Sequence, residues 1–376
     1  MLALSGSVQR YGEITSKPVC MYHGSQGECR ILSTGRSIRL CYSLCMNLVA
    51  ITRQLIDIES VTGNESAVGD FLAGYLSQLG YAVERMHATE TRFNVWAAPP
   101  EAPSPAIVFS THMDTVPPHL PSSEDGDNIY GRGACDAKGI IASQIFAAEK
   151  FRAAGKPAGL LFVVGEERDS LGASVANQHP KGSRFLINGE PTDSRLAVAS
   201  KGALRVEVTA RGKMAHSAYP ELGDSAIDRL LDSLQSLRAM KLPNNPEIGP
   251  STLNIGIVEG GRATNVIPDF AKAQMLYRLV GPSEPLRNEI VAAVGDRARV
   301  DFVLDIPYQR FRTVPGFETM TASFTTDIPQ LSKWGEPLLL GPGSILVAHT
   351  EREAISKNEL HNAVDLYVQL ANRLLE

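Results

Sequence analysis

The sequence predicts an α/β protein with a mixed, mostly parallel central sheet, into which a smaller α+β domain is inserted. Buried-type strands alternate with amphipathic helices in the first half of the chain, as in sheets covered by helices on both faces. Near residue 197 the pattern changes to half-exposed strands, and the earlier pattern returns before the C-terminus. The length of 376 residues is enough for two domains of the usual ~100–200 residues.

The first half supplies the strands and helices of the central sheet. An amphipathic helix begins just after Met46, because Leu48, Ile51, Leu55 and Ile58 recur at helical spacing. The elements expected after it are a helix over 65–80 that Gly80 ends, a strand over 105–111, a helix over 139–152, and strands over 159–165 and 184–188.

The second half predicts two helices on one antiparallel sheet. The expected elements are strands over 202–210, 252–259, 270–280 and 299–305, with helices over 223–239 and 285–295. Residues 338–348 and a helix over 357–375 then return to the earlier style. We therefore predict a discontinuous domain over 46–196 and 309–376, interrupted by an inserted domain over 197–308.

Residues 1–45 differ from everything that follows. They hold Cys20, Cys29, Cys41 and Cys45, whose spacings fit no common zinc module, whereas Cys135 alone lies in the rest of the chain. They show no sustained periodicity and no compact apolar stretch of a secretory signal. We expect a disordered or spurious extension. The alternative is a targeting segment, because these residues contain arginine and few acids.

Composition and charge exclude several classes of function. Hydrophobic residues make up 43% and charged residues 20%, as in ordinary soluble proteins. The net charge of −5 gives no sign of nucleic-acid or anionic-membrane binding. No apolar run approaches the ~20 residues of a membrane helix. A cytoplasmic protein is the default expectation.

Acids and histidines follow the predicted strands, where open α/β sheets bind their ligands. These residues are His112 and Asp114 after 105–111, Glu166 and Glu167 after 159–165, Glu190 after 184–188, and His349 near the C-terminus. Asp136 lies in a glycine-punctuated loop before the 139–152 helix. Taken singly, each has an ordinary interpretation as a turn, helix-start or strand-end residue. Because all of them follow strand ends, the pattern favours one shared site.

Two histidines with several carboxylates suit zinc or another borderline divalent ion, and cobalt or manganese fits the same ligands. Five ligands are too many for one tetrahedral zinc with an open position. They fit two ions that share a bridging carboxylate. Asp114 is expected to accept the second N–H of His112, which would fix the tautomer of that imidazole.

The order of motifs S-T-H-x-D-T-V, G-R-G-x-x-D-x-K-G, G-E-E, G-E-P-T, A-H-S, N-V-I-P and G-P-G…A-H resembles a family of di-zinc hydrolases. This family includes aminoacylase, acetylornithine deacetylase, succinyl-diaminopimelate desuccinylase and glutamate carboxypeptidase. The resemblance runs from about Met46 to the C-terminus. It implies a zinc-hydrolase catalytic domain over 46–196 and 309–376, and a lid and dimerisation domain over 197–308.

The resemblance also implies roles for the residues. His112 and Glu190 would hold one Zn²⁺, Glu167 and His349 the other, and Asp136 would bridge them. Glu166 would be the catalytic acid/base, Asp114 would orient His112, and His216 would help stabilise the oxyanion, often in a neighbouring subunit. Arg278, Asn265 and the backbone of Gly343 are the expected contacts of a substrate carboxylate. Ser344 stands where relatives often have an acid, which leaves the substrate less defined.

The leading interpretation is hydrolysis of the amide bond of an N-acyl amino acid, of the acetylornithine deacetylase or succinyl-diaminopimelate desuccinylase type. The alternative is a carboxypeptidase or dipeptidase acting on short peptides. A third hypothesis is a non-catalytic binding protein of the same fold. Such a protein should have lost some of the site residues, whereas here every site position is filled. The expected partners are a small N-acyl amino acid or short peptide and a second copy of the chain, without nucleic acid or membrane.

Overall fold

The computed structural model describes residues 47–376. The predictions made for residues 1–45, including the four early cysteines, lie outside these described residues. Cys135, the cysteine that remains, is buried and free. Among the described helices none combines the length and the apolar character needed to cross a membrane.

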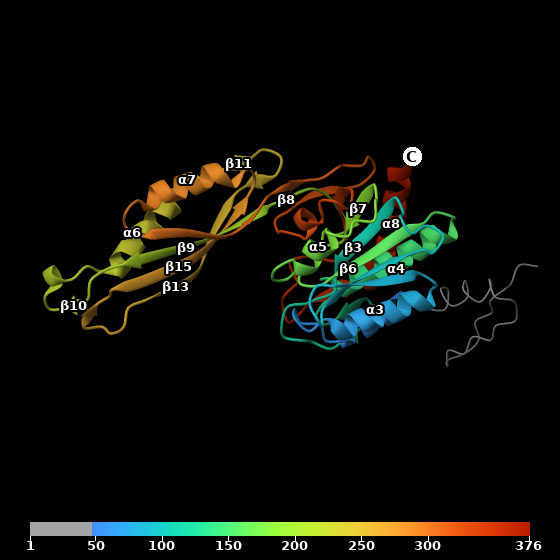
Figure 1. The fold of residues 1–376 in the computed structure, drawn as a ribbon, viewed down its shortest axis with the longest axis horizontal. Coiled ribbons are helices and arrows are strands. Elements are labelled where there is room, and N and C mark those ends of the chain that lie inside the picture. The colour runs from blue at the N-terminus through green and yellow to red at the C-terminus, as the bar shows by residue number, and fades with distance from the viewer. Residues whose placement is uncertain (1–46) are drawn as a thin grey trace, which may run out of the picture. The chain divides into compact units, whose positions relative to one another are not determined.

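A six-stranded mixed sheet forms the centre of the first domain, in the order β1-β2-β6-β3-β7-β19 (Figure 1). Its strands are β1 (Ala82–His87), β2 (Phe93–Ala98), β3 (Ile107–His112), β6 (Ala158–Val163), β7 (Phe185–Asn188) and β19 (Glu336–Leu339). The pairings of β3 with β6, of β3 with β7 and of β7 with β19 are parallel, and those of β1 and β2 are antiparallel. The predicted mixed, mostly parallel sheet is confirmed.

Helices cover both faces of this sheet, as predicted. They are α2 (Leu48–Asp57), α3 (Ser66–Gln78), α4 (Lys138–Ala153), α5 (Leu171–Ala176) and α8 (Lys357–Leu375). Phe109 packs against Tyr367 of α8 on one face, whereas Trp96 packs against Trp334 and α5 on the other. Strands β2, β3, β6 and β7 are buried at every position because both faces are covered.

Strands β1 and β2 do not stand out in the sequence. The edge strand β1 (AVERMH) is mostly exposed and half of its residues are polar, so it carries little apolar periodicity. The adjoining smaller sheets are also not predicted. Their strands are β4 (Ser123–Glu124), β5 (Asn128–Tyr130), β8 (Leu196–Ser200), β17 (Gln309–Arg310), β18 (Thr319–Ala322) and β20 (Ala354–Ser356), and the short helix η2 spans Ile328–Leu331.

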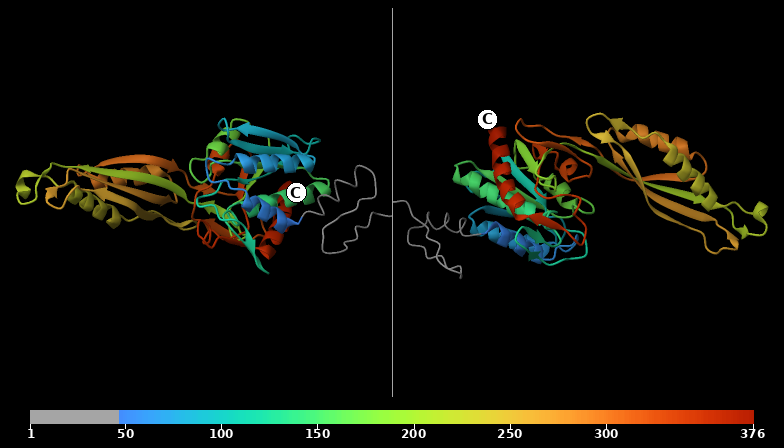
Figure 2. Two further views of the ribbon diagram at one scale, coloured as in Figure 1. Left: turned by 90° about the horizontal axis from the view of Figure 1, so that it is seen from below. Right: turned by 180° about the vertical axis from the view of Figure 1, so that it is seen from behind.

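The inserted segment folds as a four-stranded antiparallel sheet in the order β13-β15-β9-β16. Its strands are β9 (Gly202–Arg211), β13 (Thr252–Gly260), β15 (Phe270–Leu279) and β16 (Arg299–Ile306), and its helices are α6 (Ala226–Ala239) and α7 (Ser283–Val294). Both helices pack on one face, over alternate residues of β9 and β15 (Figure 2). Short elements complete the segment: β10 (Ala215–His216), η1 (Pro220–Leu222), β11 (Asn244–Asn245), β12 (Gly249–Pro250) and β14 (Val266–Ile267).

Candidate functional site

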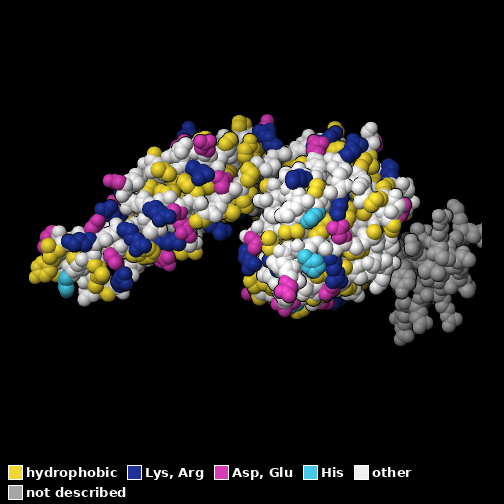
Figure 3. Space-filling view, in the orientation of Figure 1, with side chains coloured by type: hydrophobic (Ala, Val, Ile, Leu, Met, Phe, Trp, Pro, Cys, Tyr) yellow, Lys and Arg dark blue, Asp and Glu magenta, His cyan; other side chains and the backbone are white. Residues whose placement is uncertain are grey.

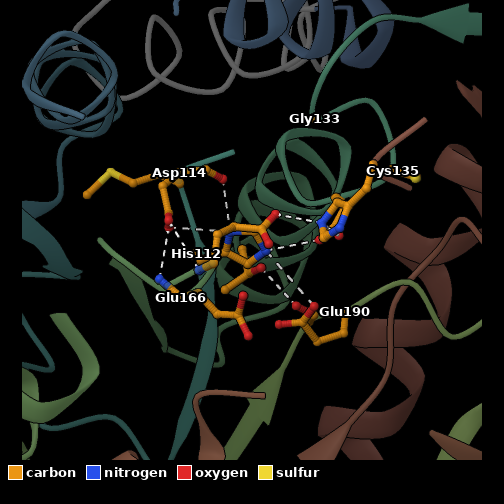
Figure 4. A network of polar contacts seen from close by, with 12 residues as sticks. His112, Asp114, Gly133, Cys135, Glu166 and Glu190 are labelled. Carbon is orange, nitrogen blue, oxygen red and sulfur yellow. Dashed lines mark hydrogen bonds and ion pairs between the residues drawn. The ribbon is translucent and has the colours of Figure 1, made fainter. Parts of the chain in front are cut away.

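Three neighbouring parallel strands deliver the site residues to one edge of the central sheet. His112 is the last residue of β3, Glu166 and Glu167 follow β6, and Glu190 follows β7. Asp136 comes from the turn that leads into α4. Parallel strands end at a common edge, which is where open α/β sheets place their ligands. Figure 4 shows His112, Glu166 and Glu190 gathered in this way.

Asp136 lies between the two predicted histidines. Its Oδ1 is 3.0 Å from His112 Nε2, and its Oδ2 is 3.4 Å from His349 Nε2. Glu167 Oε1 is 2.9 Å from the same nitrogen of His349, and Glu190 Oε2 is 4.0 Å from His112 Nε2. The structure therefore brings all five residues predicted as metal ligands into one cluster.

The tautomer of His112 leaves one ring nitrogen free to bind a metal. Nδ1 lies 3.0 Å from the backbone carbonyl oxygen of Asp114, which can only accept a hydrogen bond. Nδ1 therefore carries a proton. Burial lowers the pKa of His112, but the hydrogen bonds with Asp114 and Asp136 outweigh burial and raise it, so a metal at Nε2 would take the place of the second ring proton. The Asp114 carboxylate, which we expected to be this acceptor, is farther away, with Oδ1 at 3.5 Å.

The Asp114 carboxylate instead fixes the loop that carries the two glutamates. Its Oδ1 accepts the backbone N–H groups of Gly165 at 3.0 Å and Glu166 at 3.1 Å. Its Oδ2 accepts the N–H of Glu167 at 3.3 Å and the Thr62 hydroxyl at 2.7 Å. Burial raises the pKa of Asp114, but hydrogen bonding and the charge of His112 outweigh burial and lower it. A carboxylate held in its charged form thus positions two site residues at once.

Glu353 plays the same part for the loop that carries Asp136. It is fully buried and pairs with the buried Arg132, with Nη1 and Oε2 2.5 Å apart. Its Oε1 accepts the backbone N–H groups of Gly133 at 2.9 Å and Asp136 at 3.2 Å. Its role needs the fold, because the loop lies more than two hundred residues away in the chain.

The charges in the cluster fit a bound cation. Burial first, and then the neighbouring carboxylate Glu190, raise the pKa of Glu166, and burial also raises the pKa of Glu190 itself. Hydrogen bonds that His349 donates to Asp136 and Glu167 raise its pKa to about 10. His112, Asp136 and Glu167 each offer one ligand atom within 4.8 Å of the others. Four close acids with two imidazoles form a donor set that divalent metals suit.

Asp327 is a buried acid that the sequence reasoning missed. It begins η2, it is 1% exposed, and neither of its carboxylate oxygens has a hydrogen-bond partner among the described residues. Burial raises its pKa to about 7, although the nearby Ser170 lowers it slightly without reaching hydrogen-bond geometry. Its charge acts on Glu166 and Glu190. No strand-end position or motif spacing points to it in the sequence.

His216 and Asn265 lie together in the inserted segment rather than in the cluster. His216 belongs to β10, and the N–H of Ala218 donates to its Nδ1 at 3.1 Å. Asn265 precedes β14, which pairs with β10, and its carbonyl accepts the N–H of Ser217 at 3.0 Å. Among the described residues neither side chain contacts the five-residue cluster. Their expected roles stay predictions.

The two remaining residues expected to contact substrate, Arg278 and Gly343, differ in whether their hydrogen-bond donors are free. Arg278 lies on β15, and no described acid pairs with it, although burial lowers its pKa. The N–H of Gly343 already donates to Glu359 Oε1 at 2.8 Å, and a Cβ at Gly343 would come within 2.5 Å of Cys135 Cβ. The lack of a side chain at Gly343 therefore allows close packing against Cys135. Its N–H is already bound to Glu359, and this hydrogen bond counts against the expected role of Gly343 toward a substrate carboxylate.

Comparison with known proteins agrees with this geometry. Residues 198–301 match the family described as the peptidase dimerisation domain. A peptidase M20 domain-containing protein of Schizosaccharomyces pombe is 39% identical over 336 residues, which cover 86% of this chain and 84% of that protein. A protein of Paracoccidioides brasiliensis named "Probable carboxypeptidase" is 38% identical, with 86% and 84% covered.

A tripeptidase of Staphylococcus aureus has the same fold, with a TM-score of 0.74 at 20% identity, covering 85% of this chain and 96% of that one. The resemblance inferred from the motifs is therefore confirmed. The chain belongs to the M20 peptidase family, as a metallopeptidase-type hydrolase of amide bonds with an α/β catalytic domain and an inserted dimerisation domain.

Proposed function

We propose that the chain is a metal-dependent carboxypeptidase or dipeptidase that acts on short peptides. The observation that carries this proposal is the convergence of five ligand-type side chains beside the half-buried acid Glu166. The names of the relatives favour this function, which was the alternative in the sequence analysis, over the N-acyl amino acid deacylation that led it.

His112 and Glu190 would hold one ion, Glu167 and His349 the other, and Asp136 would bind both. This assignment is supported by the contacts of Asp136, whose two oxygens face the two histidines. Zn²⁺ fits the mixed nitrogen and oxygen donors, and Co²⁺ or Mn²⁺ fits the same set. When bound, such a pair lowers the pKa of a water molecule and polarises the scissile carbonyl.

Glu166 is the proposed acid/base. Its raised pKa suits a group that takes a proton at one step and returns it to the departing amine at the next. The hydrogen bonds from the Gly165 and Glu166 backbone to Asp114 hold it in place through the reaction. No hydrogen bond of the described residues occupies the side chain of Glu166, which leaves it free for this exchange.

The inserted segment would supply the remaining groups. His216 would stabilise the oxyanion that forms on the substrate in the active site of a neighbouring subunit. Arg278 and Asn265 would bind the substrate carboxylate. A homodimer is supported by the dimerisation-domain match and by β13, a sheet-edge strand that exposes Ile257 and Val258. We propose a cytoplasmic enzyme with a small peptide substrate and no nucleic-acid or membrane partner.

The test is a substrate panel on protein from which metal is first removed. Zn²⁺ and Co²⁺ are then supplied separately, and release of free amino acids from di- and tripeptides is compared with release from N-acetyl and N-succinyl amino acids. Turnover of peptides supports the proposal. Turnover of the acyl amino acids alone would return the deacylase interpretation, and bound metal without any turnover would favour a binding protein.

The variant Glu166→Gln tests the acid/base role in the same assay. It should keep its metal content and lose about 10²- to 10⁴-fold in kcat. Glu351→Gln, at an exposed acid two residues after His349, is the matched control and should retain activity. If Glu166→Gln keeps both metal and full turnover, Glu166 is not the acid/base.

A further inference from the structure

Lys201 and Arg278 lie side by side on the sheet face that carries no helix. Strand β9 begins at Gly202, and Ala203 pairs directly with Arg278 of β15. Leu204 points into the helix-covered core, so Ala203 and Arg278 face the opposite side. Lys201 directly precedes β9, and its Nζ donates to the carbonyl oxygen of Pro250, next to Ser251, whose hydroxyl donates to the carbonyl oxygen of Arg278. The charge of Arg278 accordingly acts on Lys201.

Both cations are partly withdrawn from water. Lys201 is only 7% exposed, and its Nζ donates to the carbonyl oxygen of Pro250 at 2.8 Å. Since an ammonium group has three N–H bonds, two remain for a ligand. Burial, and then the charge of Arg278, lower the pKa of Lys201. The neighbouring Ser251 donates its hydroxyl to the backbone carbonyl oxygen of Arg278, and no described residue accepts a hydrogen bond from the guanidinium.

Two other cations on the same face have acidic partners, whereas Arg205 and Arg211 of β9 have none among the described residues but are exposed to water. Lys272 Nζ is 2.6 Å from Glu207 Oε2, and Arg299 Nη2 is 2.6 Å from Asp301 Oδ1. Figure 3 shows this mixture of basic and acidic side chains over the inserted segment. Among the described residues no acid forms an ion pair with Lys201 or Arg278. Two adjacent, poorly solvated cations without a counter-charge are unfavourable, and a bound anion relieves this cost.

We propose that Lys201 binds the free carboxylate of the substrate together with Arg278, and that Lys201 sets the requirement for that carboxylate. This inference rests on the proposed peptidase function. The guanidinium offers a planar pair of N–H donors, and the ammonium adds a point charge beside it. Thr252, on β13, pairs with Arg278 and carries a hydroxyl on the same face of the sheet. No motif in the sequence singles out Lys201 for this role.

The experiment compares a dipeptide that has a free C-terminal carboxylate with the same dipeptide as its carboxamide, on the metal-loaded enzyme. Lys201→Gln should raise KM for the carboxylate substrate by about 10- to 100-fold, as expected for loss of one charge-assisted hydrogen bond, and leave the carboxamide unchanged. Lys201→Arg should restore most of the preference. Lys272→Gln, on the same face but paired with Glu207, is the matched control and should behave as wild type.

The outcomes separate the inference from the function. If Lys201→Gln changes both substrates equally, or neither, the inference is overturned while the peptidase function stands. If the wild-type enzyme hydrolyses no peptide, the proposed function is wrong. Calorimetric binding of hippurate to wild type and to Lys201→Gln then decides the inference. Weaker hippurate binding by Lys201→Gln, but not by Lys272→Gln, supports it. Equal binding by wild type and Lys201→Gln overturns it.

Discussion

Asp114→Asn removes one charge from the centre of the site at nearly constant volume. The Asp114 carboxylate accepts the N–H groups of Gly165, Glu166 and Glu167 and the hydroxyl of Thr62. An asparagine keeps an acceptor oxygen for the first two of these groups. Its NH₂ group would then face the N–H of Glu167, where two donors repel each other. The loop should therefore shift at Glu167.

The size of the effect follows from these contacts. Hydrogen bonds to a charged group contribute about 1.5–3 kcal/mol each, and one of them is lost while the others weaken. We expect a loss of about 2–4 kcal/mol in the free energy of unfolding, which for a chain of this length lowers Tm by about 3–6 °C. Displacing Glu167 should also weaken metal binding by about 10- to 100-fold, as is usual when a group that holds a ligand is altered.

Thermal unfolding of metal-free protein and metal titration against a chelator measure the two effects separately. Asp70→Asn is the matched control, because Asp70 is 57% exposed and pairs only with Arg85. Such an exposed pair contributes little to stability. The reasoning is refuted if Asp114→Asn unfolds at the same temperature as Asp70→Asn and binds metal as tightly as wild type.

Two further predictions concern metal binding and packing. Metal affinity should rise with pH, by up to about tenfold per pH unit for each proton released, because His349 has a pKa of about 10 without metal and must lose its proton to bind; chelator competition at pH 6, 7 and 8 checks this, and a flat profile contradicts it. Gly74→Ala should stabilise the protein by about 0.5–1 kcal/mol, since it lies exposed within α3 with open space around it. Gly189→Ala should destabilise it by about 1–3 kcal/mol, because its Cβ would come within 2.6 Å of Gln144 Nε2 and closer still to Ile140. Denaturant unfolding of the two alanine variants should move in opposite directions, and equal shifts would show that local space does not decide them.

The sequence by itself determined the class of fold and the set of chemical groups. Strands that are buried on both faces leave apolar runs, as at 107–109 and 158–163, so they can be predicted without any structure. His112, Glu167 and Glu190 could be assigned to one site because parallel strands end at a common edge. Strand β1 could not be predicted from the sequence, since an edge strand exposes most of its residues and carries no such signal.

Only the tertiary structure decided which groups hold the site residues in place and which cations lack partners. Glu353 reaches the Asp136 loop, and the backbone oxygen of Asp114 rather than its carboxylate approaches His112 most closely. The burial of Asp327 and of Lys201, and the proximity of Lys201 to Arg278, also belong to the fold. The physical reason is that a hydrogen bond or a charge interaction depends on distances of a few ångströms between residues far apart in the chain, and periodicity along the sequence does not encode those distances.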